Sequence, residues 1–268
     1  MVLMKIAAHL VHPLPVFIPA YGHFIHGKEI LSLGFKVHDH LVCGVPHDDD
    51  EPKIPRGGTV SREECLQTFP DIERKRLSGG IISYDCQLSD SERFIISLAQ
   101  SAAKQGADVA NNLEVIGFIK NKNRIRGARI KDILTGDEFD FRASFVVSTC
   151  GPWLQSILGL IEQSPEKRYG FSKAFDLVVK HKFLNDIAIG IRTQIKNYKT
   201  SELLGRRSRY LCITPWKNYS LIGTEHLPFE DNPDNLSIPE HEITNFLRKI
   251  SEAYPQASLG LEDVRFVY

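Results

Sequence analysis

The fold is decided by one short stretch of the chain, Phe145-Val146-Val147-Ser148-Thr149-Cys150-Gly151-Pro152-Trp153. Its apolar beginning favours a β-strand, and the lack of polar alternation indicates that both faces are covered, as in a parallel sheet. Small residues after this strand let a ligand approach the backbone closely, and Pro152 suits the first turn of a helix expected over residues 153–160. Ligands of open α/β sheets bind where strands end. The stretch therefore predicts either a ligand-binding turn or an ordinary buried strand.

The composition is that of a globular protein, with 268 residues, 42% hydrophobic and 25% charged. This length allows one large domain or two modest ones. Lys and Arg together number 33, as do Asp and Glu, so charge gives no reason to expect a nucleic-acid partner. Five cysteines without a Cys-x-x-Cys pair argue against disulfides or zinc and fit a reducing compartment. With no bilayer-length apolar run and no signal-peptide pattern at the N-terminus, a cytoplasmic protein is expected.

The first 42 residues are expected to form two helices, one ending before Pro13 and one over residues 28–42. This region contains several histidines, which are common metal ligands: His9, His12, His23, His26, His38 and His40. No metal-binding motif accompanies them, so no metal site is expected. Capping boxes are predicted at residues 61–64 and 89–92.

The centre of the chain predicts a strand, a helix over about residues 91–105 and an antiparallel meander closed by the strand at 145–148. The central strands are expected at residues 81–87, 108–110, 113–120, 124–133 and 138–141. Beyond Trp153 the pattern predicts strands at 174–182, 188–192, 210–214 and 220–224, a helix from Pro239 to about Tyr254, and a strand from Val264.

Motifs in order along the chain resemble those of the flavin-dependent glycerol-3-phosphate dehydrogenases, which belong to the FAD-dependent oxidoreductases related to D-amino-acid oxidase. They include Tyr84-Asp85-Cys86-Gln87, Leu134-Thr135-Gly136, the stretch Ser148 to Trp153, Leu221-Ile222-Gly223-Thr224 and Asp263-Val264-Arg265-Phe266-Val267-Tyr268. Each motif is weak alone, but the ordered set covers nearly the whole chain.

The resemblance implies an α/β (α+β) fold: part of an FAD/NAD(P)-binding-type sheet with an antiparallel meander, plus a mixed β-sheet substrate domain. The implied division is a helical and loop segment over 1–78, part of the FAD domain over 79–160, and part of the substrate domain over 161–268. This family binds the FAD pyrophosphate with Gly-x-Gly-x-x-Gly after its first strand. The sequence has no such motif, nor the family's distal Gly-x-Arg-Pro, so a fragment is expected.

The resemblance also implies cofactor contacts. Glu114 and Val115 match a strand whose backbone contacts the adenine side, although a valine there is also an ordinary core residue. The family's Asn-Ala-Thr-Gly stretch, which passes the flavin phosphate and ribitol, is matched by Ser148, Thr149 and Gly151, followed by Pro152 and Trp153. Cys150 is a candidate nucleophile, but without a histidine partner it is interpreted as an inert thiol.

For the substrate, Lys173 matches the lysine of the family's Lys-Gly-x-His strand and would face the flavin or the phosphate, or else lie exposed at a strand edge. Asp176 replaces the histidine. It is a candidate proton acceptor, but its charge would repel a phosphate dianion. Thr224 is retained as a hydrogen-bonding residue, and His226 is either a base or a surface histidine.

The implied activity is oxidation of sn-glycerol 3-phosphate to dihydroxyacetone phosphate by hydride transfer to FAD, with electrons passing to a quinone or another acceptor. The alternatives are a related flavoenzyme acting on another hydroxy acid or amine, and a non-catalytic remnant. Family members often dock on the membrane surface, so a peripheral position at the inner face of the membrane is an option. Uncovered sheet edges and apolar faces predict self-association.

Overall fold

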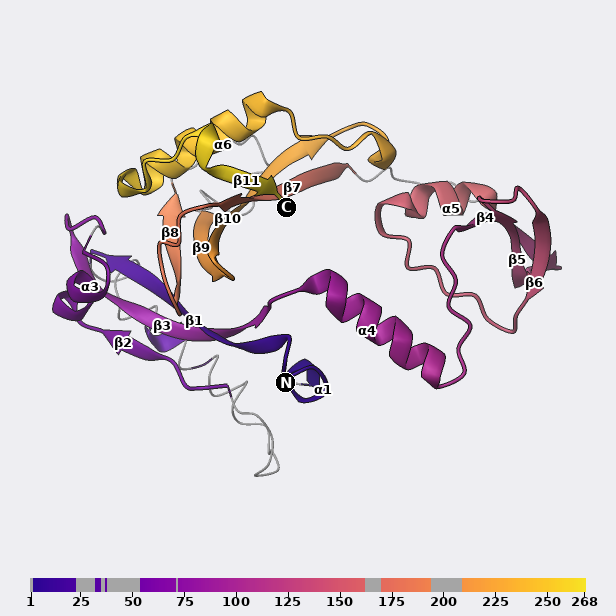
Figure 1. The fold of residues 1–268 in the computed structure, drawn as a ribbon, viewed down its shortest axis with the longest axis horizontal. Helices are drawn as coiled ribbons and strands as arrows, with labels where there is room; N and C mark the ends of the chain where they lie inside the picture. The colour runs from indigo at the N-terminus through magenta and orange to yellow at the C-terminus, as the bar shows by residue number, and fades with distance from the viewer. Residues whose placement is uncertain are drawn as a thin grey trace. The chain divides into compact units, whose positions relative to one another are not determined.

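The computed structural model describes residues 2–22, 32–34, 37, 54–70, 72–161, 170–193 and 209–268. Its strands form two sheets (Figure 1). The larger has the order β11 (Val264–Val267), β7 (Phe171–Val179), β10 (Tyr219–Phe229), β9 (Arg209–Trp216), β8 (Ala188–Thr193), β1 (Val11–Tyr21), β3 (Leu77–Leu88) and β2 (Gly58–Val60). The smaller contains β4 (Leu113–Asn121), β5 (Arg124–Asp132) and β6 (Glu138–Arg142). The helices are α1 (Val2–Ile6), α3 (Arg62–Thr68), α4 (Ser91–Lys104), α5 (Leu154–Leu160) and α6 (Glu240–Ala253).

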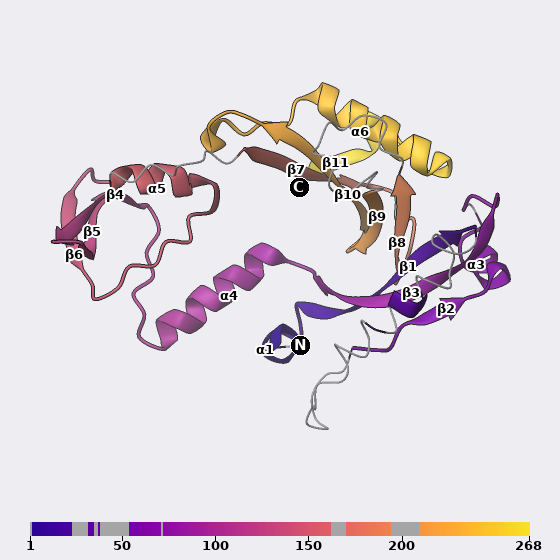
Figure 2. The same cartoon turned by 180° about the vertical axis from the view of Figure 1, so that it is seen from behind.

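The chain forms two compact units. Unit 1 comprises residues 1–94, 174–226 and 238–268, and unit 2 comprises residues 95–173 and 227–237. Unit 1 contains most of the larger sheet with α6, and unit 2 contains the three-stranded meander with α5, as Figures 1 and 2 show from opposite sides. The mixed α/β fold class is confirmed. The domain boundaries at residues 78 and 160 stay a prediction.

Strand β1 corrects the expectation of a helical N-terminal region, because only Val2–Ile6 is α-helical before it. Three prolines in β1 suggested a helix end and a loop, namely Pro13, Pro15 and Pro19. All three prolines are at odd-numbered positions of the strand. The N–H of Ser89 donates to the carbonyl of Leu10 at 2.9 Å, so the even positions of β1 exchange hydrogen bonds with β3. The prolines therefore replace N–H groups that point away from β3, which a strand tolerates.

Most central and C-terminal predictions are confirmed as β3 to β11, α4, α5 and α6. Two predicted strands are wrong, because residues 108–110 and 145–148 have no strand conformation. Phe145 is 88% exposed and Val147 is 83% exposed, and no described strand pairs with either. The apolar run thus lacks the neighbouring strand that a buried parallel strand requires. The second predicted helix lies mostly outside the described residues.

The parallel sheet expected from the sequence is largely absent from the described pairings. Only β1 and β8 pair in parallel, at Val16 and Phe17. The pairs β1–β3, β2–β3, β8–β9, β9–β10 and β7–β11 are antiparallel. The larger sheet is therefore mixed and mainly antiparallel, and its β7 end carries the candidate substrate residues.

The hydrophobic core lies in unit 1. Within the described part of the chain, Ala128 is the sole buried apolar residue of unit 2. In unit 1, α6 buries Phe246, Leu247 and Ile250, and Phe246 meets Phe175 of β7 edge-on, with ring centroids 5.6 Å apart. The nearly buried Glu225 of β10 accepts a hydrogen bond from Lys249 of α6 at 2.5 Å. These contacts fix which face of β7 and β10 is covered.

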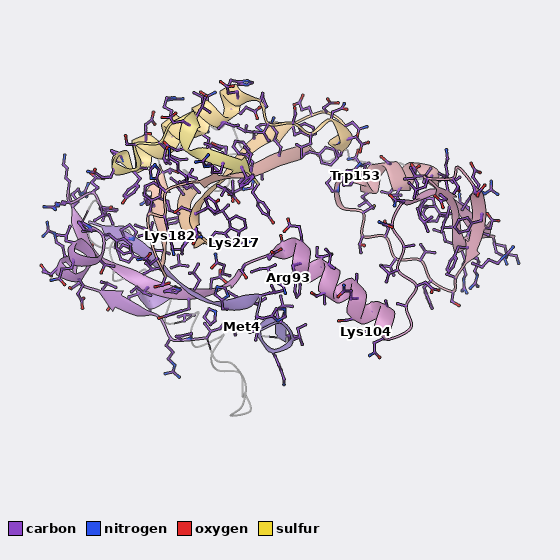
Figure 3. The ribbon with its side chains drawn as sticks, viewed as in Figure 1. Met4, Arg93, Lys104, Trp153, Lys182 and Lys217 are labelled. Atoms are coloured by element: carbon purple, nitrogen blue, oxygen red, sulfur yellow. The ribbon has the colours of Figure 1, made fainter. Side chains whose placement is uncertain are left out.

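The helix starts confirm one capping box and modify the other. Ser61 and Glu64 form the predicted reciprocal pair at the start of α3. At α4 the Asp90 carboxylate accepts from the Arg93 N–H at 3.1 Å, and Ser89 donates instead to the Leu10 carbonyl. Figure 3 labels Arg93 and Lys104 at the two ends of α4. No residue of this helix is fully buried, although Phe94 is partly buried and packs against the core cluster of Met4, Ala7, Leu10 and Val11. None of the helices in the described ranges is long and apolar enough to cross a bilayer.

We predict that Asp263 makes unit 1 acid-sensitive. Its carboxylate pairs with Lys180 at 2.8 Å, accepts the Gly260 N–H at 2.8 Å and lies 3.2 Å from His181. The hydrogen bonds from Lys180 and Gly260 lower its pKa from 3.8 to about 2. A lowered folded-state pKa stabilises above the unfolded-state pKa, so this contribution is lost as pH falls from about 4 to 2.

Urea unfolding at pH 2 to 7 tests this prediction. Asp263→Asn should be less stable near neutral pH and lose less stability on acidification than the wild-type protein. Glu252→Gln, in the exposed pair with Arg248, is the control and should follow the wild type. Parallel pH curves for Asp263→Asn and wild type would contradict the prediction.

Candidate functional site

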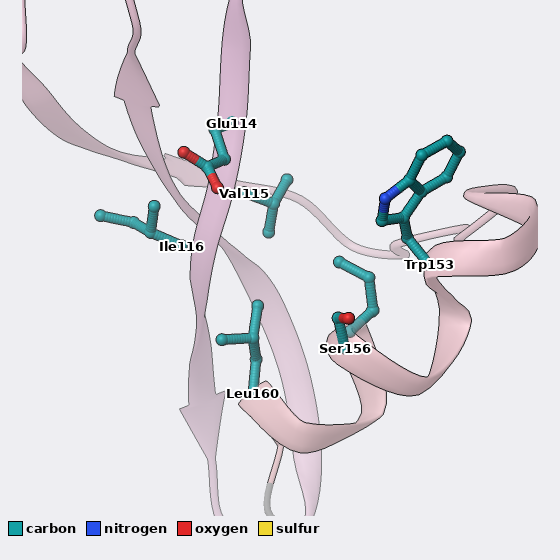
Figure 4. A pocket seen from close by; sticks show the side chains of 7 residues that line it. Glu114, Val115, Ile116, Trp153, Ser156 and Leu160 are labelled. Atoms are coloured by element: carbon teal, nitrogen blue, oxygen red, sulfur yellow. The ribbon is translucent and has the colours of Figure 1, made fainter. Parts of the chain in front are cut away.

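Unit 2 contains a cavity of about 420 Å³ between β4 and α5 (Figure 4). It is lined by Glu114, Val115, Ile116, Trp153, Ser156, Ile157 and Leu160. Val115 on the strand and Trp153 on the helix side both face the cavity (Figure 4). The cavity thus brings together three of the predicted cofactor residues, Glu114, Val115 and Trp153, whereas Ser148, Thr149, Gly151 and Pro152 are not among the residues that line it. The sequence interpretation missed Ser156, Ile157 and Leu160 of α5, whose spacing from Trp153 by three, four and seven positions marks one face of a helix.

The indole of Trp153 is held by its own hydrogen bond. Its Nε1–H donates to Asp234 Oδ1 at 2.8 Å. The Asp234 N–H in turn donates to the Asn232 side chain at 3.0 Å, which caps the short 3₁₀ helix η3 (Pro233–Asn235). A side chain fixed in this way gives the cavity a rigid aromatic wall. Asp234 and Asn232 were not predicted as site residues.

The segment between β6 and α5 presents free backbone N–H groups. Among the described residues, none accepts a hydrogen bond from the N–H of Ser148, Thr149 or Gly151. Cys150 has φ −79° and ψ 12°, and Gly151 follows in the left-handed region at φ +52°. Successive residues of opposite hand turn their N–H groups to one side, which favours an anion. Gly151 also has open space where a side chain would begin.

Cys150 has no base beside it in the described structure. Its sulfur lies 3.1 Å from the Ser148 hydroxyl. Within the described residues, no three His, Cys, Asp or Glu side chains lie close enough together to hold a metal ion. A thiol needs a base or a positive neighbour to act as a nucleophile. The contacts therefore support the interpretation of Cys150 as an inert thiol that is partly accessible.

Asp176 and Thr224 lie together in unit 1. Asp176 on β7 accepts a hydrogen bond from the Thr224 side chain on β10, and burial raises its pKa, while that hydrogen bond and the charge of His226 lower it in part. A half-buried carboxylate with a raised pKa is a candidate acid or base. The structure thus joins two of the three predicted catalytic residues and places His226 near them.

Lys173 belongs to unit 2 and points elsewhere. It is three positions from Asp176 on β7, and side chains three apart on a strand point to opposite faces. Its Nζ donates to the Ser237 carbonyl at 3.2 Å and lies 6.0 Å from the centroid of the Phe229 ring. A role in substrate binding stays a prediction for Lys173.

Comparison with solved structures shows a shared fold. The chain matches the Bacillus halodurans glycerol-3-phosphate dehydrogenase complexed with FAD over 100% of its own length and 45% of that chain, with a TM-score of 0.74 and 18% identity. It matches the FAD-bound L-α-glycerophosphate oxidase of Mycoplasma pneumoniae over 99% of its length with a TM-score of 0.65. The fold is therefore that of an FAD-binding oxidoreductase.

Sequence comparison then gives the family. The family described as DAO, FAD dependent oxidoreductase, matches residues 48–268, and the chain belongs to this family. It is 28% identical to the mitochondrial glycerol-3-phosphate dehydrogenase of Macaca fascicularis over 91% of the chain, and 27% identical to the glycerol-3-phosphate dehydrogenase of Synechocystis over 100%. It spans only 32% and 47% of these two relatives.

Proposed function

We propose that this chain supplies part of the FAD site and the proton acceptor of a dehydrogenase that oxidises sn-glycerol 3-phosphate to dihydroxyacetone phosphate. The observation that carries the proposal is the half-buried Asp176 carboxylate, hydrogen-bonded to Thr224. The collinear similarity to enzymes named glycerol-3-phosphate dehydrogenase supports the substrate.

The residues of unit 2 fit parts of the cofactor. The cavity offers apolar walls and the fixed indole of Trp153 to a flat ring. The unpaired N–H groups beside Gly151 offer hydrogen bonds to a phosphate. We assign a flat ring of FAD to the cavity at Glu114, Val115 and Trp153. We assign the phosphate to the backbone N–H groups of Ser148, Thr149 and Gly151; Pro152, which has no N–H, follows this turn without donating to it. Bound FAD supplies the hydride-accepting chemistry.

Asp176 takes the hydroxyl proton of the substrate in the proposed mechanism. Burial raises its pKa, which brings its basicity nearer to that of an effective general base at neutral pH. Thr224 keeps the carboxylate oriented, and His226 balances part of its charge. The resemblance implies Lys173 as the phosphate ligand, but its place on the opposite face of β7 from Asp176 does not support that role.

A second substrate class is favoured by the charge of Asp176. A carboxylate attracts an ammonium group, and it repels the single charge of a hydroxy acid less than it repels a phosphate dianion, so an amine or another hydroxy acid is the alternative. The remaining alternative, a non-catalytic remnant, is consistent with the share of each relative that the chain spans. Retention of flavin separates the remnant from both enzymes, and a substrate panel separates the enzymes.

The proposed electron acceptor is a quinone, reached from a peripheral position on the membrane surface. Helix α1 supports this position, because it buries Met4 but exposes Val2, Leu3 and Ile6. A short helix with an exposed apolar side can lie in the membrane interface.

We predict that the chain retains FAD through the backbone at Gly151. Gly151→Ala should weaken FAD binding about 5- to 30-fold, because a Cβ in the left-handed region costs roughly 1–2 kcal/mol. Gly136→Ala is the matched control, since Gly136 also has a positive φ of +82° and open space, but lies in the meander turn. Absorbance at the flavin band after removal of free FAD measures binding. Equal losses in both variants would contradict the assignment, and no retained flavin in the wild-type chain would favour the remnant.

We predict that Asp176→Asn slows flavin bleaching by glycerol 3-phosphate about 10²- to 10⁴-fold, the usual contribution of a general base. In the wild-type protein the rate should rise with pH through the raised pKa of Asp176, because only the carboxylate accepts a proton. Asp186→Asn, at an exposed position, is the control. Stopped-flow absorbance with glycerol 3-phosphate, hydroxy acids and amines measures both rate and preference. An unchanged rate in Asp176→Asn would refute its role.

We predict that the chain self-associates through the apolar surface of unit 2. Exposed apolar residues of this extent favour association, and Phe145 and Val147 are 88% and 83% exposed. The double change Phe145→Ser and Val147→Ser should shift the sedimentation distribution towards the monomer. Val2→Ser, at a residue of unit 1 that is 71% exposed, is the control. A monodisperse wild-type monomer with a sharp melt would contradict the prediction.

A further inference from the structure

The Asp176 side chain reaches across a neighbouring strand. In the larger sheet β10 lies between β7, which carries Asp176, and β9, which carries Cys212. Gly223 of β10 is the residue paired with Cys212. A Cβ built on Gly223 would overlap the Asp176 carboxylate. The carboxylate therefore lies directly over the glycine, in the space that any other residue would fill with its side chain.

Cys212 lies on β9, on the opposite side of β10 from the strand that carries Asp176. Burial raises the pKa of the Cys212 thiol, and the charge of Asp176 raises it further. The carboxylate is thus close enough to act on a residue two strands away. On the near side, the next residue of β10, Thr224, donates its hydroxyl to the same carboxylate. Neighbouring residues of β10 therefore define both the position and the orientation of Asp176.

We propose that Gly223 and Thr224 are the positioning residues of this site. Because Gly223 has no side chain, the Asp176 carboxylate can lie over β10 at this position, and the Thr224 hydroxyl orients that carboxylate by a hydrogen bond. The catalytic meaning of this arrangement rests on the proposed function, in which Asp176 takes the substrate proton. The arrangement itself does not depend on flavin.

Other charged groups near Asp176 set the conditions of the test. Among the described residues, His226 on β10 and Cys212 on β9 are the titratable side chains that interact with it. On the other side, Tyr268 beyond β11 exchanges two backbone hydrogen bonds with Asp176, of 2.8 and 2.9 Å. All variants are compared at the same pH, so a difference in the reactivity of the Cys212 thiol between them reports the Asp176 carboxylate.

Gly190 provides a matched control for Gly223. It lies on β8 and pairs with the same Cys212 from the opposite side. A Cβ at Gly190 would meet Tyr210 at 3.6 Å and Ile18 at 3.7 Å, which are ordinary contact distances. The same one-methyl substitution can therefore be made on both sides of Cys212, with only one of them displacing the carboxylate.

The first experiment measures alkylation of Cys212 by iodoacetamide at pH 8 to 10, followed by mass spectrometry of its peptide. Asp176→Asn should raise the rate at the lowest pH, because loss of the carboxylate charge lowers the pKa of the Cys212 thiol and increases the reactive thiolate fraction. Gly223→Ala should raise it likewise, and Gly190→Ala should leave it unchanged. Equal rates in Gly223→Ala and Gly190→Ala would overturn the role of Gly223.

The second experiment tests Thr224 and stands even if Gly223→Ala does not fold. A ¹³C NMR titration of the Asp176 carboxyl should show a higher pKa in Thr224→Val, because a hydrogen bond to the carboxylate is lost. Thr224→Ser should restore the wild-type value. An unchanged pKa in Thr224→Val would overturn the proposal. If both experiments succeed and the chain shows no dehydrogenase activity, the proposed function fails and the positioning roles stand.

Discussion

The packing of α6 on one face of the larger sheet is the constraint on which the candidate substrate site depends. Phe175 meets Phe246, and Glu225 is paired with Lys249, so these two strand residues face the helix. Their neighbours Asp176 and Thr224 must then face the other side, because side chains alternate along a strand. Removing Lys249 would leave the nearly buried Glu225 charge unpaired, which is costly. The hydrophobic layer under α6 thus decides where the polar residues emerge.

Unit 2 is stabilised by backbone hydrogen bonds more than by a buried hydrophobic core. Its meander satisfies backbone hydrogen bonds through the pairing of β4, β5 and β6, but within the described residues it buries only Ala128. A three-stranded sheet needs a covered hydrophobic face to be stable. Helix α5 covers part of β4 and so forms the cavity. The remaining apolar surface of unit 2, including Phe145 and Val147, stays exposed. Unit 2, which carries the proposed flavin contacts, therefore depends more than unit 1 on further contacts for its stability.

Local signals predicted much of this fold. The predicted meander is confirmed as the hairpins β4–β5 and β5–β6, and the turn between β4 and β5 has Lys122 in the left-handed region at φ +52°. Helix α6 begins directly after Pro239, close to its predicted start. The errors came from partners that local sequence does not reveal. The shared parity of the β1 prolines has meaning only against β3, and the run at 145–148 suggested a buried strand although no described strand pairs with it.

The candidate site shows the same division. Asp176, Thr224 and the segment before Trp153 were found by position in motifs, and the structure joins Asp176 to Thr224. The α5 residues that line the cavity share one helix face by their spacing, so they could have been predicted from the sequence, but they were not. The crossing from Asp176 over Gly223 to Cys212 involves three strands and a register that no local pattern contains. Sequence identified the residue types, and only the strand order shows which of them share a space.

The position of Asp176 also limits how a phosphorylated alcohol can bind. Two unit charges 4 Å apart in a setting of intermediate dielectric interact by about 4 kcal/mol, and a phosphate dianion would roughly double this repulsion. Under the proposed function, the hydroxyl end of glycerol 3-phosphate would therefore face Asp176, with its phosphate turned away. The nearby His226 acts against this repulsion, because its charge lowers the Asp176 pKa. A substrate with an ammonium group would need no such orientation, so the preference between these two classes is a direct measure of how far the carboxylate charge controls the site.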